Sequence, residues 1–312
     1  MRKILLASTA LVAMGVSAAS ADITLSGDAK WTYSSWSVTG SSLNNNTFAT
    51  SNALTIASSF ASDNGLTYGT SHSLTHGTTN DGQKLYVSGS FGELRFGGAT
   101  AGDAFDMSAD VADGEVNKTG AAFDGDSKAA MADDNAVSYF TPAVNGFSAG
   151  VAVGDAGATS DADVSEYGLS YSQDVGGASV KLAYASGDTS KSAASADDGV
   201  SASSMGASIT YGDLTVTLAS NSYKADNGTF DYDGTGVGVS YVLQEGLTLK
   251  AHTKSADDSK DATYDSNEVA ASLTYVVAPG LTANVAYTDY ELTDGGTKTS
   301  GSATSAYLKV AF

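Results

Sequence analysis

Apolar and polar residues alternate with a period of two along most of the chain after about residue 22. Around residue 95, for example, Leu94 and Phe96 face one way while Glu93 and Arg95 face the other. This alternation is typical of β-strands, whereas a helix places apolar residues three and four positions apart. Helical periodicity and long apolar runs are both missing from this part of the sequence, which predicts an all-β fold.

The alternation predicts sixteen strands, and an even number of antiparallel strands favours a closed transmembrane barrel. The expected strands cover residues 23–35, 46–60, 66–75, 83–91, 93–98, 135–141, 147–153, 165–172, 178–185, 203–211, 214–223, 230–242, 247–254, 268–276, 281–290 and 304–312. Connections after odd-numbered strands are long and acidic, as in 100–134, 185–199 and 291–301, while those after even-numbered strands are short. Long extracellular loops and short periplasmic turns are the signature of an outer-membrane barrel.

Aromatic residues end the even-numbered strands, in phase with the apolar positions. They are Phe60, Phe91, Tyr139, Tyr171, Tyr211, Tyr241, Tyr275 and Phe312. Rings at one height on one face form a girdle at the membrane–water boundary. A second, less regular girdle is predicted from Trp31, Trp36, Tyr184, Tyr223 and Tyr287. A soluble β-sandwich or β-helix fits less well, because the alternate face is Ser, Thr, Asn, Asp, Lys and Gly throughout.

Residues 1–21 have a basic start, an apolar run and a small-residue end, which predicts a secretory signal peptide. Residues 22–312 would then form the barrel.

Removing Arg2 and Lys3 with the signal peptide leaves 13 basic and 35 acidic residues, so the formal net charge becomes 13 − 35 = −22. Such a charge argues against nucleic-acid binding, which needs a basic surface. The sequence has no cysteine, so disulfides do not stabilise it. No later segment is apolar enough for a transmembrane helix.

A barrel of sixteen strands encloses a water-filled lumen that something must narrow. Only the 100–134 connection is long enough to fold inward. We expect it to present pore-constricting carboxylates, and the candidates are Asp103, Asp106, Asp110, Asp113 and Glu115. The alternative is a solvated extracellular loop in which these acids only aid solubility.

Basic residues should line the pore wall that faces this loop. Strand parity turns Lys30, Lys84, Arg95 and Lys309 inward, and a charge on the lipid face would cost a few kcal/mol near the midplane. Lys181, Lys250 and Lys254 are expected to point inward as well, on the far wall. Because rows of charged side chains set ion selectivity, the strongly negative balance predicts a cation-selective channel.

Signals for an enzyme or for a metal site are weak. His72, His76 and His252 fall in no catalytic or metal-binding spacing, since four residues along a strand span about 13 Å. Asp231-Tyr232-Asp233-Gly234 resembles the start of a calcium loop but lacks the rest of the pattern. No cofactor is expected to be required, and the acidic extracellular loops are a candidate site for bound Ca²⁺.

Three segments resemble the Rhodobacter-type general porins of alphaproteobacteria: ITLSGDAKW, DGQKLYVSGSFGELRFGGATAGDAFD and AYLKVAF. The resemblance implies a homotrimer of sixteen-stranded barrels, in each of which the third extracellular loop folds into the pore with acids facing a basic cluster. That loop corresponds to 100–134, and Lys30 and Arg95 fall on the basic wall. Such porins carry several arginines on the second strand, whereas residues 46–60 have none, and this difference favours cation selectivity.

The predicted function is therefore passive diffusion of small hydrophilic solutes and ions through an outer-membrane porin. Its expected partners are these solutes, outer-membrane lipid with lipopolysaccharide, and two further copies of the chain. One alternative is a substrate-specific channel, which would need aromatic residues along the lumen; Tyr86 and Tyr307 point inward by parity. The other alternative is a structural or adhesive barrel with no open pore.

Overall fold

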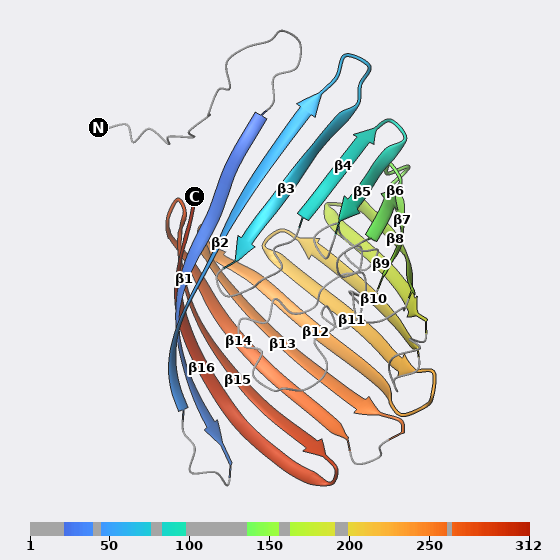
Figure 1. Ribbon diagram of the computed structural model, residues 1–312. Coiled ribbons are helices and arrows are strands. Elements are labelled where there is room, and N and C mark those ends of the chain that lie inside the picture. Colours follow the sequence, from blue (N-terminus) through green and yellow to red (C-terminus); the bar gives the residue numbers. More distant parts are fainter. Residues whose placement is uncertain are drawn as a thin grey trace, which may run out of the picture.

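The computed structural model describes residues 22–39, 45–75, 83–97, 136–155, 163–190, 199–260 and 264–312. These residues form sixteen β-strands that close into one barrel (Figure 1). The strands are β1 (Asp22–Val38), β2 (Asn45–Ala61), β3 (Thr67–Thr75), β4 (Gln83–Gly89), β5 (Gly92–Gly97), β6 (Ala136–Phe140), β7 (Phe147–Asp155), β8 (Asp163–Val175), β9 (Ala178–Thr189), β10 (Val200–Tyr211), β11 (Leu214–Ala225), β12 (Asp231–Gln244), β13 (Leu247–Asp258), β14 (Asp265–Ala278), β15 (Leu281–Asp294) and β16 (Thr297–Ala311).

Each strand pairs antiparallel with its neighbours in sequence, and β1 pairs with β16 to close the sheet. Closure gives the backbone groups of every strand a partner on both sides, which a sheet in a bilayer requires. The predicted sixteen-stranded antiparallel barrel is thus confirmed. No helix among the described residues is long and apolar enough to cross a membrane.

The predicted connection 291–301 proved wrong. β15 and β16 stay paired as far as Asp294 and Thr297, and only Gly295 and Gly296 join them. Both glycines have positive φ, 55° and 77°, as a two-residue hairpin turn requires. The polar composition of 291–301 indicated a loop, but the strands here extend beyond their apolar segments.

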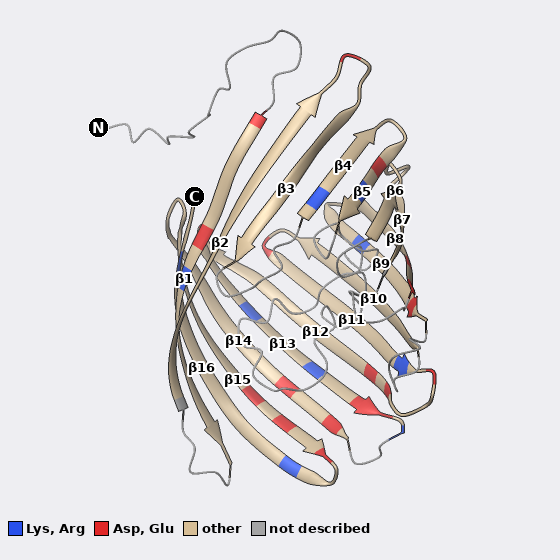
Figure 2. Cartoon of the chain, viewed as in Figure 1, with Lys and Arg blue, Asp and Glu red and all other residues tan. Residues whose placement is uncertain are grey.

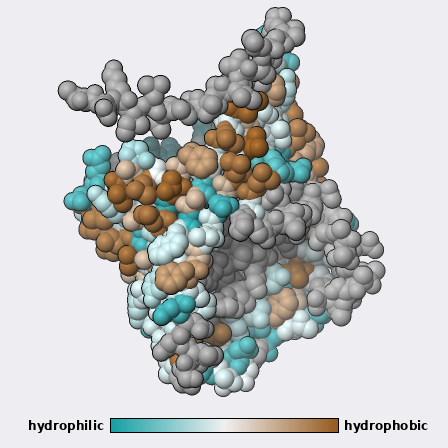
Figure 3. Space-filling view, turned by 60° about the vertical axis from the view of Figure 1, so that its left-hand side comes forward, coloured by the Kyte–Doolittle hydropathy of each residue, from teal (hydrophilic) through white to brown (hydrophobic). Residues whose placement is uncertain are grey.

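The side chains on the two faces of the wall differ in size and polarity. Large apolar side chains such as Leu25, Leu85 and Leu273 are exposed on the outer face, and hydrophobic residues gather in broad patches in the space-filling view (Figure 3). The largest fully buried side chains are instead small and polar: Asn284, Thr288, Ser138 and Ser305. By the alternation of each strand these four lie on the inner face, so the barrel interior is not a packed apolar core.

The aromatic residues mostly follow the predicted girdles. Tyr211, Tyr241, Tyr275 and Phe312 are exposed at the short-turn end, and Trp31, Tyr184 and Tyr287 are exposed higher on the outer face. Trp36 and Tyr223 were assigned to the second girdle wrongly. Trp36 packs against Ala286 and Ala303, and Tyr223 against Ala185 and Ala202, all on the inner face. Both lie one position out of phase with the lipid-facing residues of their strands.

Candidate pore lining

Lys30 and Lys309 lie side by side on the inner face, because they are directly opposite each other where β1 pairs with β16. The Lys30 Nζ stands 5.4 Å from the centroid of the Tyr307 ring. The Lys309 Nζ is 3.7 Å from Oδ2 of Asp28. A cation over an aromatic face and a carboxylate beside an ammonium group each offset part of the repulsion between the two lysines.

Lys84 and Arg95 form a second inward-facing pair on β4 and β5. The Lys84 Nζ lies 5.4 Å from the centroid of the Tyr86 ring, and Tyr86 is directly opposite Arg95. The Tyr86 hydroxyl donates a hydrogen bond of 3.1 Å to the Ser59 Oγ. The Tyr86 ring therefore lies across Gly69 of β3 and points toward β2, away from Arg95.

The Arg95 guanidinium has partners on both sides. Its Nε lies 2.5 Å from Oε1 of Glu93, and its Cζ lies 4.2 Å from the centroid of the Phe140 ring on β6. The side chains of Arg95 and Glu93 remain 23% and 28% exposed, so the charge is fixed in place while it still meets solvent. A positioned charge of this kind can act on a passing ion.

All four predicted basic residues therefore point inward, but as two pairs. β1 and β4 are three strand positions apart, which corresponds to about 14 Å across the strands, and successive partners set Lys84 level with Thr24 rather than with Lys30. The inner faces of β2 and β3 between the pairs carry small residues, among them Thr55 and Ser73, whose hydroxyls are 3.0 Å apart. The sequence placed the four basic residues on neighbouring strands but could not show that the two pairs are separated by the small residues of β2 and β3.

The predicted acids Asp103, Asp106, Asp110, Asp113 and Glu115 lie outside the described residues. The strands that bound their segment are described, and Gly97 at the end of β5 is directly opposite Ala136 at the start of β6. The segment 98–135 therefore connects two strands that are paired with each other. The arrangement of the acids stays a prediction.

Lys250 and Lys254 were expected on the far wall, and the strand order gives this a different meaning for each basic pair. β13, which carries both, is only three strand positions from β16 but eight from β5, so these lysines lie across the barrel from Arg95 and near Lys309. β9 with Lys181 is eight positions from β1. Six of the seven inward-facing lysines and arginines of the described residues thus lie on the half of the wall from β13 through β16 to β5. Position in the sequence is a poor guide here, because closure brings the last strands beside the first.

The sequence did not reveal a charged group on β13 and β14. The His252 Nε2 lies 2.9 Å from Oε1 of Glu268, and both side chains are about nine-tenths buried, with 10% and 11% exposed. Lys254 is directly opposite Glu268. Parity alone turns all three inward, but only the register between the strands shows that they meet.

No cluster of three or more His, Asp or Glu side chains suited to a metal ion occurs within the described ranges. Asp231 and Asp233 belong to the strand β12 rather than to a loop, and the Lys224 Nζ lies 3.3 Å from the Asp231 carboxylate. His76 lies outside the described residues. A Ca²⁺ site in the acidic loops stays a prediction.

A closed barrel with an apolar outside and a polar, charged inside defines a channel of the outer-membrane porin class. The chain belongs to the Gram-negative porin family, whose model matches residues 7–295. Both the predicted general porin family and the outer-membrane location are confirmed by this match. No curated protein matches the chain.

Three solved structures illustrate the likeness in fold. A loop-deletion mutant of OmpT, an outer membrane protein of Vibrio cholerae, has a TM-score of 0.72 and 14% identity over 95% of this chain and 100% of that chain. The anion-selective porin from Comamonas acidovorans has a TM-score of 0.67 and 16% identity over 94% and 100%. A mutant of the Rh. blastica porin has a TM-score of 0.63 and 17% identity over 93% and 100%.

Proposed function

We propose that the barrel is a water-filled pore for passive diffusion of small hydrophilic solutes and ions. The observation that carries this proposal is the inner wall itself, on which Lys30, Lys84, Arg95 and Lys309 face the lumen together with small polar residues. Hydrated solutes pass such a surface without losing their hydrogen bonds. The closed sheet keeps this surface apart from lipid.

Conductance of the purified protein in planar bilayers tests the proposal. A general pore gives large, ohmic single-channel steps that do not saturate with solute concentration. A substrate-specific channel would be blocked saturably by one class of solute, and a structural or adhesive barrel would give no steps. Either of the last two results contradicts passive general diffusion.

The pore should prefer cations. Its support is the net charge of −22 after cleavage, the lack of arginine in 46–60, and the carboxylates beside several inward bases, such as Asp28 and Glu93. Acidic residues also gather at the loop-side ends of β12–β15 (Figure 2), where they raise the local concentration of cations. A fold shared with an anion-selective porin decides nothing about this preference, because the lining charges do.

Carboxylates of 100–134 are proposed to narrow the pore opposite the basic pairs. The triple variant Asp103→Asn, Asp106→Asn and Asp110→Asn should lower the cation preference, measured as the reversal potential in a salt gradient. Asp213→Asn in the short turn between β10 and β11 is the matched control, and it should leave the potential unchanged. An equal shift per removed carboxylate in the two variants would show that total charge, rather than a constriction, sets selectivity.

The likeness to Rhodobacter-type porins suggests a homotrimer, and OmpT of Vibrio cholerae has also been solved in a trimer form. The outer face of β2–β4 supports a protein contact. Cross-strand partners place Leu25, Ile56, His72 and Gln83 in one outward row, and an imidazole and an amide facing hydrocarbon without partners would be costly. An unheated sample should run on a gel near three times the mass of the monomer; a monomeric band would contradict the trimer.

A second candidate function is a preference for ring-shaped solutes, favoured by an aromatic cluster at the loop side of the inner wall. Tyr223 and Phe230 stack with centroids 5.1 Å apart, Phe230 and Tyr232 follow at 5.4 Å, and Tyr232 meets the edge of Tyr264 at 5.1 Å. Saturable current block by a sugar, reduced in Tyr232→Ala, would favour this function over general diffusion.

A further inference from the structure

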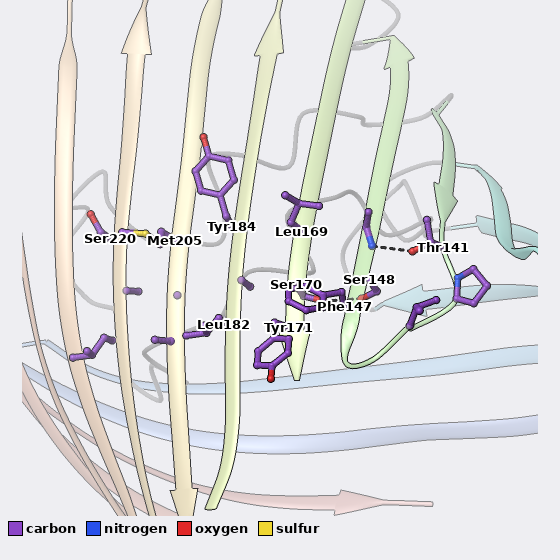
Figure 4. Close-up of a pocket in the computed structure, with 18 of the residues that line it drawn as sticks. Thr141, Phe147, Ser148, Leu169, Ser170, Tyr171, Leu182, Tyr184, Met205 and Ser220 are labelled. Carbon is purple, nitrogen blue, oxygen red and sulfur yellow. Dashed lines mark hydrogen bonds between the residues drawn. The ribbon is translucent and has the colours of Figure 1, made fainter. Parts of the chain in front are cut away.

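A broad groove of about 900 Å³ runs across the outer surface from β6 to β11. Figure 4 shows Phe147, Tyr171, Leu182, Tyr184 and Met205 along it. Most of these side chains are large, apolar and exposed: Phe147 is 61% and Met205 57% exposed. The described residues that line the groove include no charged side chain.

The groove arises from one small residue in a row of large ones. Successive cross-strand partners place Phe147, Tyr171, Leu182, Ala207 and Leu218 in line across β7–β11. Directly opposite residues on one face have Cβ atoms only about 5 Å apart. The methyl group of Ala207 therefore lies low between Leu182 and Leu218, and the wall is hollow at this point.

The groove lies within the part of the wall that faces hydrocarbon. Tyr171 and Tyr211 of the periplasmic aromatic girdle mark its lower level. On the loop side, Ser186, Ser203 and Ser222 are directly opposite one another and form a polar row across β9–β11. Pro142 and Phe147, beside the short turn between β6 and β7, line its periplasmic end.

The occupant is lipid rather than a second copy of the chain. In the closed strand order, β10 and β11 lie eight positions from β2 and β3, across the barrel from the outward row that contains His72. The β7–β11 face shows apolar side chains between the girdle and the serine row, as a lipid-facing surface does. An uncharged, apolar groove suits an acyl chain, and its described lining residues include no charged side chain that would bind a phosphate group.

We propose that this groove holds an acyl chain of a phospholipid from the periplasmic leaflet as a long-lived, stoichiometric ligand. Its opening at the girdle level places the headgroup beside the short periplasmic turns, and the groove then directs the chain toward the middle of the bilayer. The proposal extends the proposed function and does not depend on which solutes pass through the pore.

The test uses the full barrel reconstituted into vesicles of phosphatidylethanolamine and phosphatidylglycerol, re-extracted in detergent and weighed by native mass spectrometry. We expect one phospholipid per barrel to remain after the bulk lipid is removed. Ala207→Phe fills the groove and should abolish this added mass. Ala251→Phe is the matched control, because Ala251 is exposed on the outer face of β13 and is as far in sequence from Gly246 of its short turn as Ala207 is from Gly212; it should keep the lipid.

Wild-type protein without retained phospholipid, or equal retention in Ala207→Phe and Ala251→Phe, would overturn the proposal. Assembly beyond the trimer that Ala207→Phe abolishes would overturn it in favour of a protein occupant. Leu218→Ala covers the case in which Ala207→Phe fails to fold, since it removes one side of the groove and should lower retention without adding bulk. Conductance recorded on the same samples separates this proposal from the proposed pore function. Lipid retention tests the groove, whereas conductance tests the pore, so a variant that loses the lipid and keeps its conductance bears on the groove alone.

Discussion

At the scale of single residues, alternation decides whether a side chain meets lipid or water. Lys30 and Trp31 are neighbours in sequence, yet Trp31 is 47% exposed on the outer face while Lys30 faces Lys309 inside. A shift of one position would exchange them. The partners then fix each charge: Arg95 owes its position to Glu93 and Phe140, not to its strand alone.

Arg95→Gln should make the pore more cation-selective, because it removes a fixed positive charge and leaves the Glu93 carboxylate without its partner. A unit charge at 4 Å contributes about 1 kcal/mol in water, so the cation-to-anion permeability ratio should rise by up to about fivefold. Reversal potentials measure this ratio. Lys224→Gln, which removes a basic residue on the outer face, should leave the ratio unchanged; a similar rise in both variants would contradict a local role for Arg95.

At the scale of elements, the hairpins differ in what holds their loop-side ends. β15 and β16 are joined by two glycines with positive φ, so their pairing continues to the last residue. β11 and β12 are joined by residues 226–230, and the stacked rings of Tyr223, Phe230 and Tyr232 hold their ends together. Turn geometry stabilises the first hairpin end and aromatic packing the second.

Gly295→Val should destabilise the β15–β16 hairpin, since a β-branched residue at a φ of 55° is strained by about 1–2 kcal/mol. Gly295→Asn is the matched control, because asparagine adopts this conformation more readily. The temperature at which the barrel loses its folded gel mobility should fall in the valine variant and stay near the wild-type value in the asparagine variant. Equal temperatures for the two variants would show that the turn does not limit stability.

At the scale of the whole molecule, the barrel separates two solvents. Among the described residues, the inner face has mostly small and charged residues with some aromatic rings and no packed apolar core, while the outer face exposes large apolar side chains. Burial of apolar surface therefore depends on the bilayer, and hydrogen bonding around the closed sheet holds the strands together. This arrangement makes the energetic effect of a charge depend on the face it occupies.

Leu218→Lys places an ammonium group on the lipid face of β11, four residues further into the membrane than Leu214 at the level of the girdle. A lysine near the midplane costs about 2–4 kcal/mol. Thr217→Lys is its control on the inner face, one residue away. We expect the fraction of barrels that fold into vesicles to fall for Leu218→Lys and to stay near the wild-type level for Thr217→Lys. If both variants folded equally well, the assignment of the two faces would be wrong.

The sequence by itself determined the strand number, the two faces and the inward direction of Lys30, Lys84, Arg95 and Lys309, because alternation with a period of two is a local property of each strand. Only the tertiary structure decided which of these side chains meet. Closure brings β13 near β16 and β1, register joins His252 to Glu268, and a row of partners across five strands hollows the outer wall at Ala207. These are non-local pairings, set by how far each strand slides along its neighbour, and no single stretch of sequence contains that information.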